Sequence, residues 1–125
     1  MSLVLSPELS EDEKLYRGVL EQFWDYQNDR PSSALFKDSN GVSVDRCNGR
    51  RPEDCVKDLN SRRSFPRVAS ISVRDVTHVG AISIYAPVAN NPYHCEIYDD
   101  SEKNKIGAKK AKLLRDLIEK VYVPD

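Results

Sequence analysis

The fold is decided by residues 67–98, RVASISVRDVTHVGAISIYAPVANNPYHCEIY, where strand periodicity runs directly into a group of reactive side chains. Apolar and polar residues alternate over 69–74 and again over 82–86. A period of two predicts a strand in each place. The polar stretch 75–80, which ends in a glycine, predicts a short connection between the two strands.

A third strand is predicted for residues 94–98. The prolines that precede it interrupt the ladder, because proline has no N–H to donate and favours an extended conformation in the residue before it. Within the strand, Cys95 and Ile97 share one face while His94 and Glu96 share the other. If Cys95 and Ile97 are buried, His94 and Glu96 therefore point outward together.

Alternation also predicts strands near residues 15–19 and 41–46. A short helix is expected to begin at Ser6, followed by Pro7 at its first position, and another is expected from Pro52 to about residue 60. Residues 24–40 have no sustained period, which predicts a long ordered loop with Leu35 and Phe36 as apolar anchors.

A long amphipathic helix is predicted from Ser101 to about Val121. Its apolar stripe recurs at spacings of three and four and consists of Ile106, Leu113, Leu114, Leu117, Ile118 and Val121. Such a helix covers a sheet. We therefore expect an α+β fold with a single domain over residues 1–125. A mixed, curved sheet of about five short strands, near residues 15, 42, 70, 83 and 96, packs against the C-terminal helix.

The charge composition limits the kinds of partner that the chain is expected to bind. The 125 residues carry 19 basic and 20 acidic side chains, a balance that disfavours a nucleic-acid partner. The most basic stretch is 46–67, which contains Arg46, Arg62 and Arg63 as candidate anion contacts and Arg50 and Arg51 as expected solvent-exposed charges. The expected partner is a small anionic ligand or a protein.

Three cysteines without a C-x-x-C pair argue against a disulfide framework and against a zinc site. The first residues are acidic where a secretory signal needs a basic start, and no stretch approaches the ~20 apolar residues of a membrane span. We therefore expect a cytoplasmic protein without a membrane segment, a metal or a cofactor. Cys95 is expected to be a buried small hydrophobe, and His78 a solvated turn residue.

Four motifs follow one another along the chain: Leu15-Tyr-Arg17, Arg30-Pro-Ser-Ser33 with Phe36-Lys-Asp38, Val42-Ser-Val-Asp45, and Asn91-Pro-Tyr-His94. They resemble a family of small, mostly stand-alone bacterial proteins of unknown function that show Leu-Tyr-Arg, Arg-Pro-Ser-Ser-x-x-Phe, Leu-Ser-Val and Asn-Pro-x-His in this order. The resemblance implies a bacterial origin and a shared pocket. Its matching polar residues are Arg17, Ser32, Ser33, Ser43, Asn91 and His94. The apolar segment 81–86 and the arginine-rich middle depart from the pattern.

Two residues are the candidate catalytic groups. His94 can act as a general base beside the carboxylate of Glu96, or it can be a structural histidine bonded to a loop carbonyl. The candidate ligand-binding residues are Arg17, Ser32, Ser33, Ser43 and Asn91. Ser32 and Ser33 can bind an anion or simply cap the next turn. Asp45 is a further candidate acid.

These residues are compatible with two main classes of function and with a third alternative. The first is a module that binds an anionic ligand or a partner without turnover. The second is a nucleotide-acting enzyme, since the order of Arg17, Ser43 and Glu96 is similar to the Arg, Ser, Glu order of ADP-ribosyltransferases; the Ser-Thr-Ser triplet and the paired acids of that superfamily are absent. The third is an RNA-cleaving enzyme with His94 as base.

Overall fold

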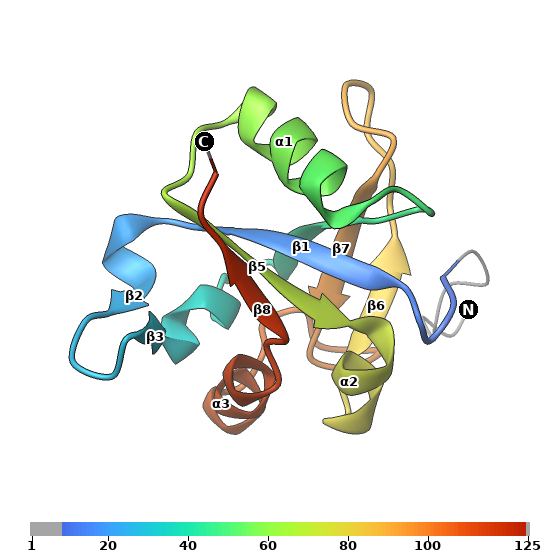
Figure 1. Cartoon of the computed structure of the whole chain (residues 1–125). Coiled ribbons are helices and arrows are strands. Elements are labelled where there is room, and N and C mark those ends of the chain that lie inside the picture. Colours follow the sequence, from blue (N-terminus) through green and yellow to red (C-terminus); the bar gives the residue numbers. More distant parts are fainter. Residues whose placement is uncertain (1–8, 125) are drawn as a thin grey trace.

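The computed structural model describes residues 9–124, which form a small α+β domain (Figure 1). Its main sheet has six strands, β1 (Lys14–Val19), β4 (Val42–Arg46), β5 (Arg67–Ser72), β6 (Ile82–Tyr85), β7 (His94–Tyr98) and β8 (Lys120–Tyr122), in the order β6-β7-β4-β1-β5-β8. A separate ribbon pairs β2 (Trp24–Asp25) with β3 (Arg30–Pro31). The helices are α1 (Pro52–Arg62), α2 (Val73–His78) and α3 (Ala108–Asp116), with 3₁₀ turns η1 (Glu21–Phe23) and η2 (Ser33–Phe36).

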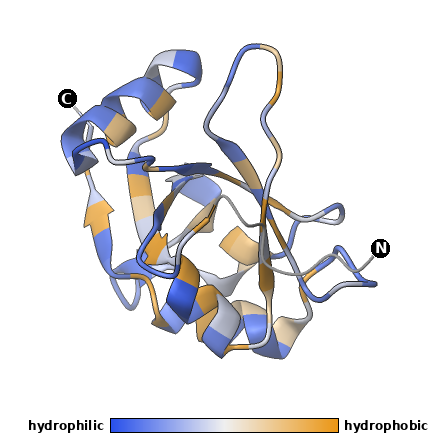
Figure 2. Cartoon of the chain, turned by 90° about the vertical axis from the view of Figure 1, so that its right-hand side faces the viewer, coloured by the Kyte–Doolittle hydropathy of each residue, from blue (hydrophilic) through white to orange (hydrophobic). Residues whose placement is uncertain are grey.

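The sheet separates two hydrophobic clusters, because alternate residues of each strand point to opposite faces. On one face, Leu15 and Val19 of β1 pack with residues of α2, α3 and η2. On the other, Tyr16 packs with Val56 and Leu59 of α1. Figure 1 shows α1 on one side of the sheet and α2 and α3 on the other. In Figure 2, hydrophobic segments gather along the strands, and the helices carry hydrophilic residues on their outward sides.

The five expected strands are all present in the main sheet. The alternation in 94–98 has the expected sense, since Cys95 and Ile97 are fully buried and His94 and Glu96 lie on the opposite face. The sheet is not mixed, however, because every strand pairing in it is antiparallel. The predicted connection at 75–80 is instead mostly helix α2, which the Ser72 side chain caps by accepting a hydrogen bond from the Asp75 amide at 3.1 Å.

The predicted C-terminal helix, from Ser101 to about Val121, was too long. α3 covers nine residues and begins only after Gly107, because carboxylates of the preceding loop take up the amides that a helix would need. Asp100 accepts from the amides of Glu102 and Lys103, and Asp99 accepts from that of Gly107. At the other end the chain leaves the helix and joins the sheet as β8. The sixth strand therefore comes from a segment whose sequence favours a helix.

The expected N-terminal helix lies mostly outside the described residues. From residue 9 onward the chain forms a turn, in which the Glu13 amide donates to the Ser10 carbonyl, before β1 begins at Lys14. No helix between residues 9 and 124 is long and apolar enough to cross a membrane.

Candidate functional site

A polar cleft of about 310 Å³ lies between the C-terminal end of α1 and the sheet. Strands β1, β4 and β7 form its floor, and the end of α1 with the segment that follows forms one wall. Polar or aromatic side chains that line it include Arg17, Ser43, Asp45, Arg62, Arg63, Phe65, Asn91 and His94. Four of the predicted site residues, Arg17, Ser43, Asn91 and His94, therefore meet around one hollow.

Strand register explains why these side chains meet. Val42 and Val44 of β4 are buried in the core on the far side, so Ser43 and Asp45 face α1. β4 pairs with β7 so that Ser43 lies opposite Glu96 and Asp45 lies opposite His94. Ser43 and Glu96, which are 53 positions apart in the sequence, thus become cross-strand neighbours, and so do Asp45 and His94, which are 49 positions apart.

The Glu96 carboxylate contacts both His94 and Ser43. Its Oε2 atom is bonded to His94 Nε2 and also accepts a hydrogen bond from Ser43 Oγ at 3.1 Å. The side chains of His94 and Glu96 are only 19% and 17% exposed. The serine hydroxyl donates to the carboxylate and not to the histidine, so the arrangement differs from a Ser-His-acid triad.

Arg17 fills a gap in the sheet. The β1–β4 ladder ends after Tyr16 and Asp45, and the guanidinium of the next residue on β1 enters the space that opens. Nη1 donates to the Ser43 carbonyl at 3.0 Å, while Nη2 donates to the Leu35 carbonyl at 3.2 Å and to Asp38 Oδ2 at 2.9 Å. Arg17 therefore holds the Ser43 strand and the η2 loop together at the edge of the cleft.

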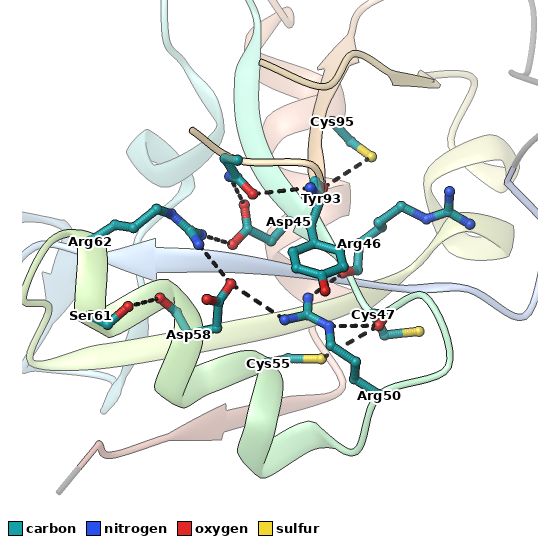
Figure 3. A network of polar contacts seen from close by, with 11 residues as sticks. Asp45, Arg46, Cys47, Arg50, Cys55, Asp58, Ser61, Arg62, Tyr93 and Cys95 are labelled. Carbon is teal, nitrogen blue, oxygen red and sulfur yellow. Dashed lines mark hydrogen bonds and ion pairs between the residues drawn. The ribbon is translucent and has the colours of Figure 1, made fainter. Parts of the chain in front are cut away.

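Asp45 is a buried carboxylate at the end of the cleft floor. Asn91 Nδ2 donates to its Oδ1 atom at 2.9 Å, and Arg62 forms an ion pair with Oδ2 (Figure 3). The Asn91 side chain also accepts from the Tyr93 amide at 3.0 Å. The loop before β7, the β4 strand and the end of α1 are thereby tied together at one point.

A second acid extends this network along α1. Asp58 pairs with Arg62 at 2.6 Å and with Arg50 at 3.3 Å, and the Arg50 guanidinium lies 3.5 Å from the centre of the Tyr93 ring (Figure 3). Arg50 was expected to be a solvent-exposed charge, but its side chain is only 18% exposed. Its other partners, the Arg46 and Cys47 carbonyls, are close in sequence, and the fold adds the distant Tyr93 ring that covers the guanidinium.

Arg63 differs from the other two arginines of the cleft. Arg17 and Arg62 are each paired with a carboxylate, whereas within residues 9–124 the contact of Arg63 is the Phe65 ring, 5.2 Å away. That ring lies directly against Gly18, where an added Cβ would come within 2.5 Å of it. The glycine thus lets Phe65 form the wall beside Arg63.

Ser32 and Ser33 lie at the start of η2, outside the lining of the cleft. The Ser32 amide donates to the Phe23 carbonyl, and its own carbonyl accepts from Leu35, while its hydroxyl makes no capping hydrogen bond. This loop reaches the cleft through Asp38, which lines it, and through the contacts of Arg17 with Leu35 and Asp38.

Two of the three cysteines, Cys55 and Cys95, are fully buried. Burial raises the pKa of Cys95 to about 12 and that of Cys55 to about 11, so both thiols stay protonated near neutral pH. His78, the other histidine, is exposed at the end of α2. Among residues 9–124, no group of three or more His, Cys, Asp or Glu side chains is placed to hold a metal ion.

The chain matches no protein-family model, no curated protein and no solved structure at a significant level.

Proposed function

We propose that the cleft binds a small anionic ligand, with Arg63 as the anchoring cation. The observation that carries this proposal is the difference in pairing among the three cleft arginines. The carboxylates of Asp38, Asp45 and Asp58 neutralise Arg17 and Arg62. In the described part of the chain, Arg63 has an aromatic ring beside it and no carboxylate, so its charge is available to a ligand.

The rest of the cleft suits such a ligand. Ser43, Asn91 and His94 line it with polar side chains around the cation. The Asn91 amide has a second N–H besides the one that it donates to Asp45. Its volume of about 310 Å³ is at the lower end of the range for small-molecule sites, which favours a ligand no larger than a mononucleotide. The resemblance to the small bacterial proteins supports the same place, because four of the six polar residues it matches line this cleft.

Calorimetric titration with inorganic phosphate and with adenosine 5′-monophosphate tests the proposal. The wild-type protein should bind at least one of the two, and Arg63→Met should weaken that binding about tenfold through loss of a charge-assisted contact. Arg51→Met is the matched control, since Arg51 is 74% exposed and lies outside the cleft. Absence of binding, or equal losses in both variants, would refute an anion site at Arg63.

A second candidate is a nucleotide-acting enzyme similar to ADP-ribosyltransferases, and one observation favours it. Arg17, Ser43 and Glu96 stand on three adjacent strands, β1, β4 and β7. Arg17 donates to the backbone of Ser43, whose hydroxyl donates to Glu96. The three residues whose order along the chain is similar to that superfamily are thus joined in one hydrogen-bonded chain.

The chemistry assigns a role to each group. In ADP-ribosyl transfer, the bond between ribose C1′ and the nicotinamide nitrogen breaks and its electron pair leaves with nicotinamide. C1′ then bonds to an oxygen or nitrogen of the acceptor, whose proton passes to a base. Glu96 would be that base and His94 would orient its carboxylate, while Arg17 keeps Ser43 in place.

Release of nicotinamide from NAD, followed by chromatography, tests this second candidate. Glu96→Gln should lower the rate by about 10²- to 10⁴-fold, the usual contribution of a general base, while the melting temperature stays near that of the wild type. Glu102→Gln, an exposed glutamate outside the cleft, is the matched control. No release by the wild-type protein, or equal rates for wild type and Glu96→Gln, would exclude this activity.

A further inference from the structure

A groove of about 710 Å³, more than twice the volume of the polar cleft, lies between α1 and the end of the chain after β8. One wall is a stripe on α1 that includes Glu53, Val56 and Lys57, and the other is formed by Tyr122, Val123 and Pro124. Figure 1 shows α1 and the chain leaving β8 side by side on the same side of the sheet.

The apolar part of the groove contains both a hollow and a protruding apolar side chain. Val56 and Tyr122 belong to the cluster beneath α1 and line the groove. Val123, at its rim, is 75% exposed, the most exposed large apolar residue of the described chain. A hollow beside a protruding apolar side chain on one patch is what a two-fold contact between identical surfaces requires.

The charged residues of the groove are also complementary to a second copy of the same surface. Glu53 and Lys57 lie one helical turn apart on the stripe of α1 that lines the groove, and both are exposed. In the described residues neither forms an ion pair with the other or with any neighbour. When two copies of α1 cross a two-fold axis in antiparallel directions, Glu53 of each copy meets Lys57 of the other. Val56 then lies close to the axis.

We propose that the groove is the interface of a homodimer, in which the occupant is the same groove of a second copy of this chain. The Val123 side chains enter the apolar hollow of the opposite copy, and two reciprocal Glu53–Lys57 pairs set the antiparallel direction. This interface is separate from the polar cleft, so it does not depend on the proposed ligand.

Sedimentation velocity on the full chain, over a range of protein concentrations at low salt, tests the dimer. The wild type should reach twice the 14.2 kDa mass of one chain. Glu53→Lys should weaken the dimer about tenfold, because two attractive pairs become two repulsive ones. Glu102→Lys has the same change in charge outside the groove and should leave the dimer unchanged.

Mixing two variants gives the sharper result. In Glu53→Lys both groove positions are positive, and in Lys57→Glu both are negative, so each variant alone should be mostly monomeric. An equimolar mixture should form a heterodimer tighter than either homodimer by at least tenfold, and the double variant Glu53→Lys/Lys57→Glu should dimerise like the wild type. Circular dichroism melts at low concentration establish that each variant is folded.

Two results would overturn the proposal. One is a wild-type chain that stays monomeric at all concentrations. The other is a dimer that Glu53→Lys weakens no more than Glu102→Lys does, or one that mixing the two groove variants does not restore.

Discussion

Asp45 and His94 lie directly opposite each other on β4 and β7, and each is bonded to a different neighbour. Asp45 is held by Asn91 and Arg62, and His94 by Glu96. The carboxylates of Asp45 and Glu96 are therefore diagonal across the ladder, at a spacing of about 7–8 Å between backbones. Asp45 thus belongs to the framework of the cleft, whereas Glu96 lies outside its lining and reaches it through Ser43 and His94.

Asp45→Asn should destabilise the protein by about 2 kcal/mol. The substitution removes the charge that Arg62 and Asn91 contact at a buried position, while Arg62 keeps Asp58 as its other carboxylate, and loss of a buried charge-assisted bond costs more than an exposed pair contributes. Urea unfolding measures this. Asp54→Asn, which removes the partner of the exposed Arg51, should change the free energy of unfolding by less than about 1 kcal/mol. Equal losses would contradict the framework role.

Glu13 should make the stability depend on pH. Burial opposes its charge, but hydrogen bonds from Arg46, the Asn48 amide and Cys47 together hold the pKa of this carboxyl below its ordinary value of 4.5. A carboxyl whose pKa is lower in the folded state adds stability above its unfolded pKa and loses it as the pH falls through the folded value.

The free energy of unfolding of the wild type should therefore decline as the pH falls below about 4.5. Glu13→Gln should be less stable at pH 7 by about 3 kcal/mol and should decline less steeply in acid. Denaturant titrations at a series of pH values compare the two chains. Parallel pH profiles would show that Glu13 is not the group responsible.

Gly18→Ala should push Phe65 away from β1. The added Cβ would come within 2.5 Å of the ring, and such overpacking costs about 1–3 kcal/mol. Phe65→Ala should abolish most of this cost, so a double-mutant cycle of thermal melts isolates the contact. If Gly18→Ala costs the same in both backgrounds, the ring is not the cause.

Arg17→Met should cost about 2–3 kcal/mol, because the Ser43 and Leu35 carbonyls and Asp38 all lose their donor. Arg17→Lys should restore little of it, since one ammonium cannot reproduce the planar fork that reaches all three acceptors. Urea unfolding of both variants tests this. Full rescue by lysine would mean that charge alone, and not the bridging geometry, is what matters.

Local pattern was sufficient to predict the strands. The alternation over 69–72, 82–85 and 94–98 determines which side chains of a strand share a face, and the burial of Cys95 and Ile97 follows from it. Val73 and Arg74, for which the alternation predicted a continued strand, instead begin α2. The same kind of reasoning failed for residues 117–122. Their spacing favours a helix, but pairing of Val121 with Ala69 and of Tyr122 with Val68 draws them into the sheet.

For the cleft, the motifs of the sequence predicted a shared pocket with six polar residues. Arg17, Ser43, Asn91 and His94 line the cleft, whereas Ser32 and Ser33 lie outside it at the start of η2. Only the tertiary structure decided which charges remain available, because an ion pair depends on the distance between groups that the chain brings together from far apart. Asp38 lies 21 positions from Arg17, and Asp45 lies 17 positions from Arg62. No local pattern encodes those pairings, and in the described part of the chain they leave Arg63 as the cleft arginine without a carboxylate partner.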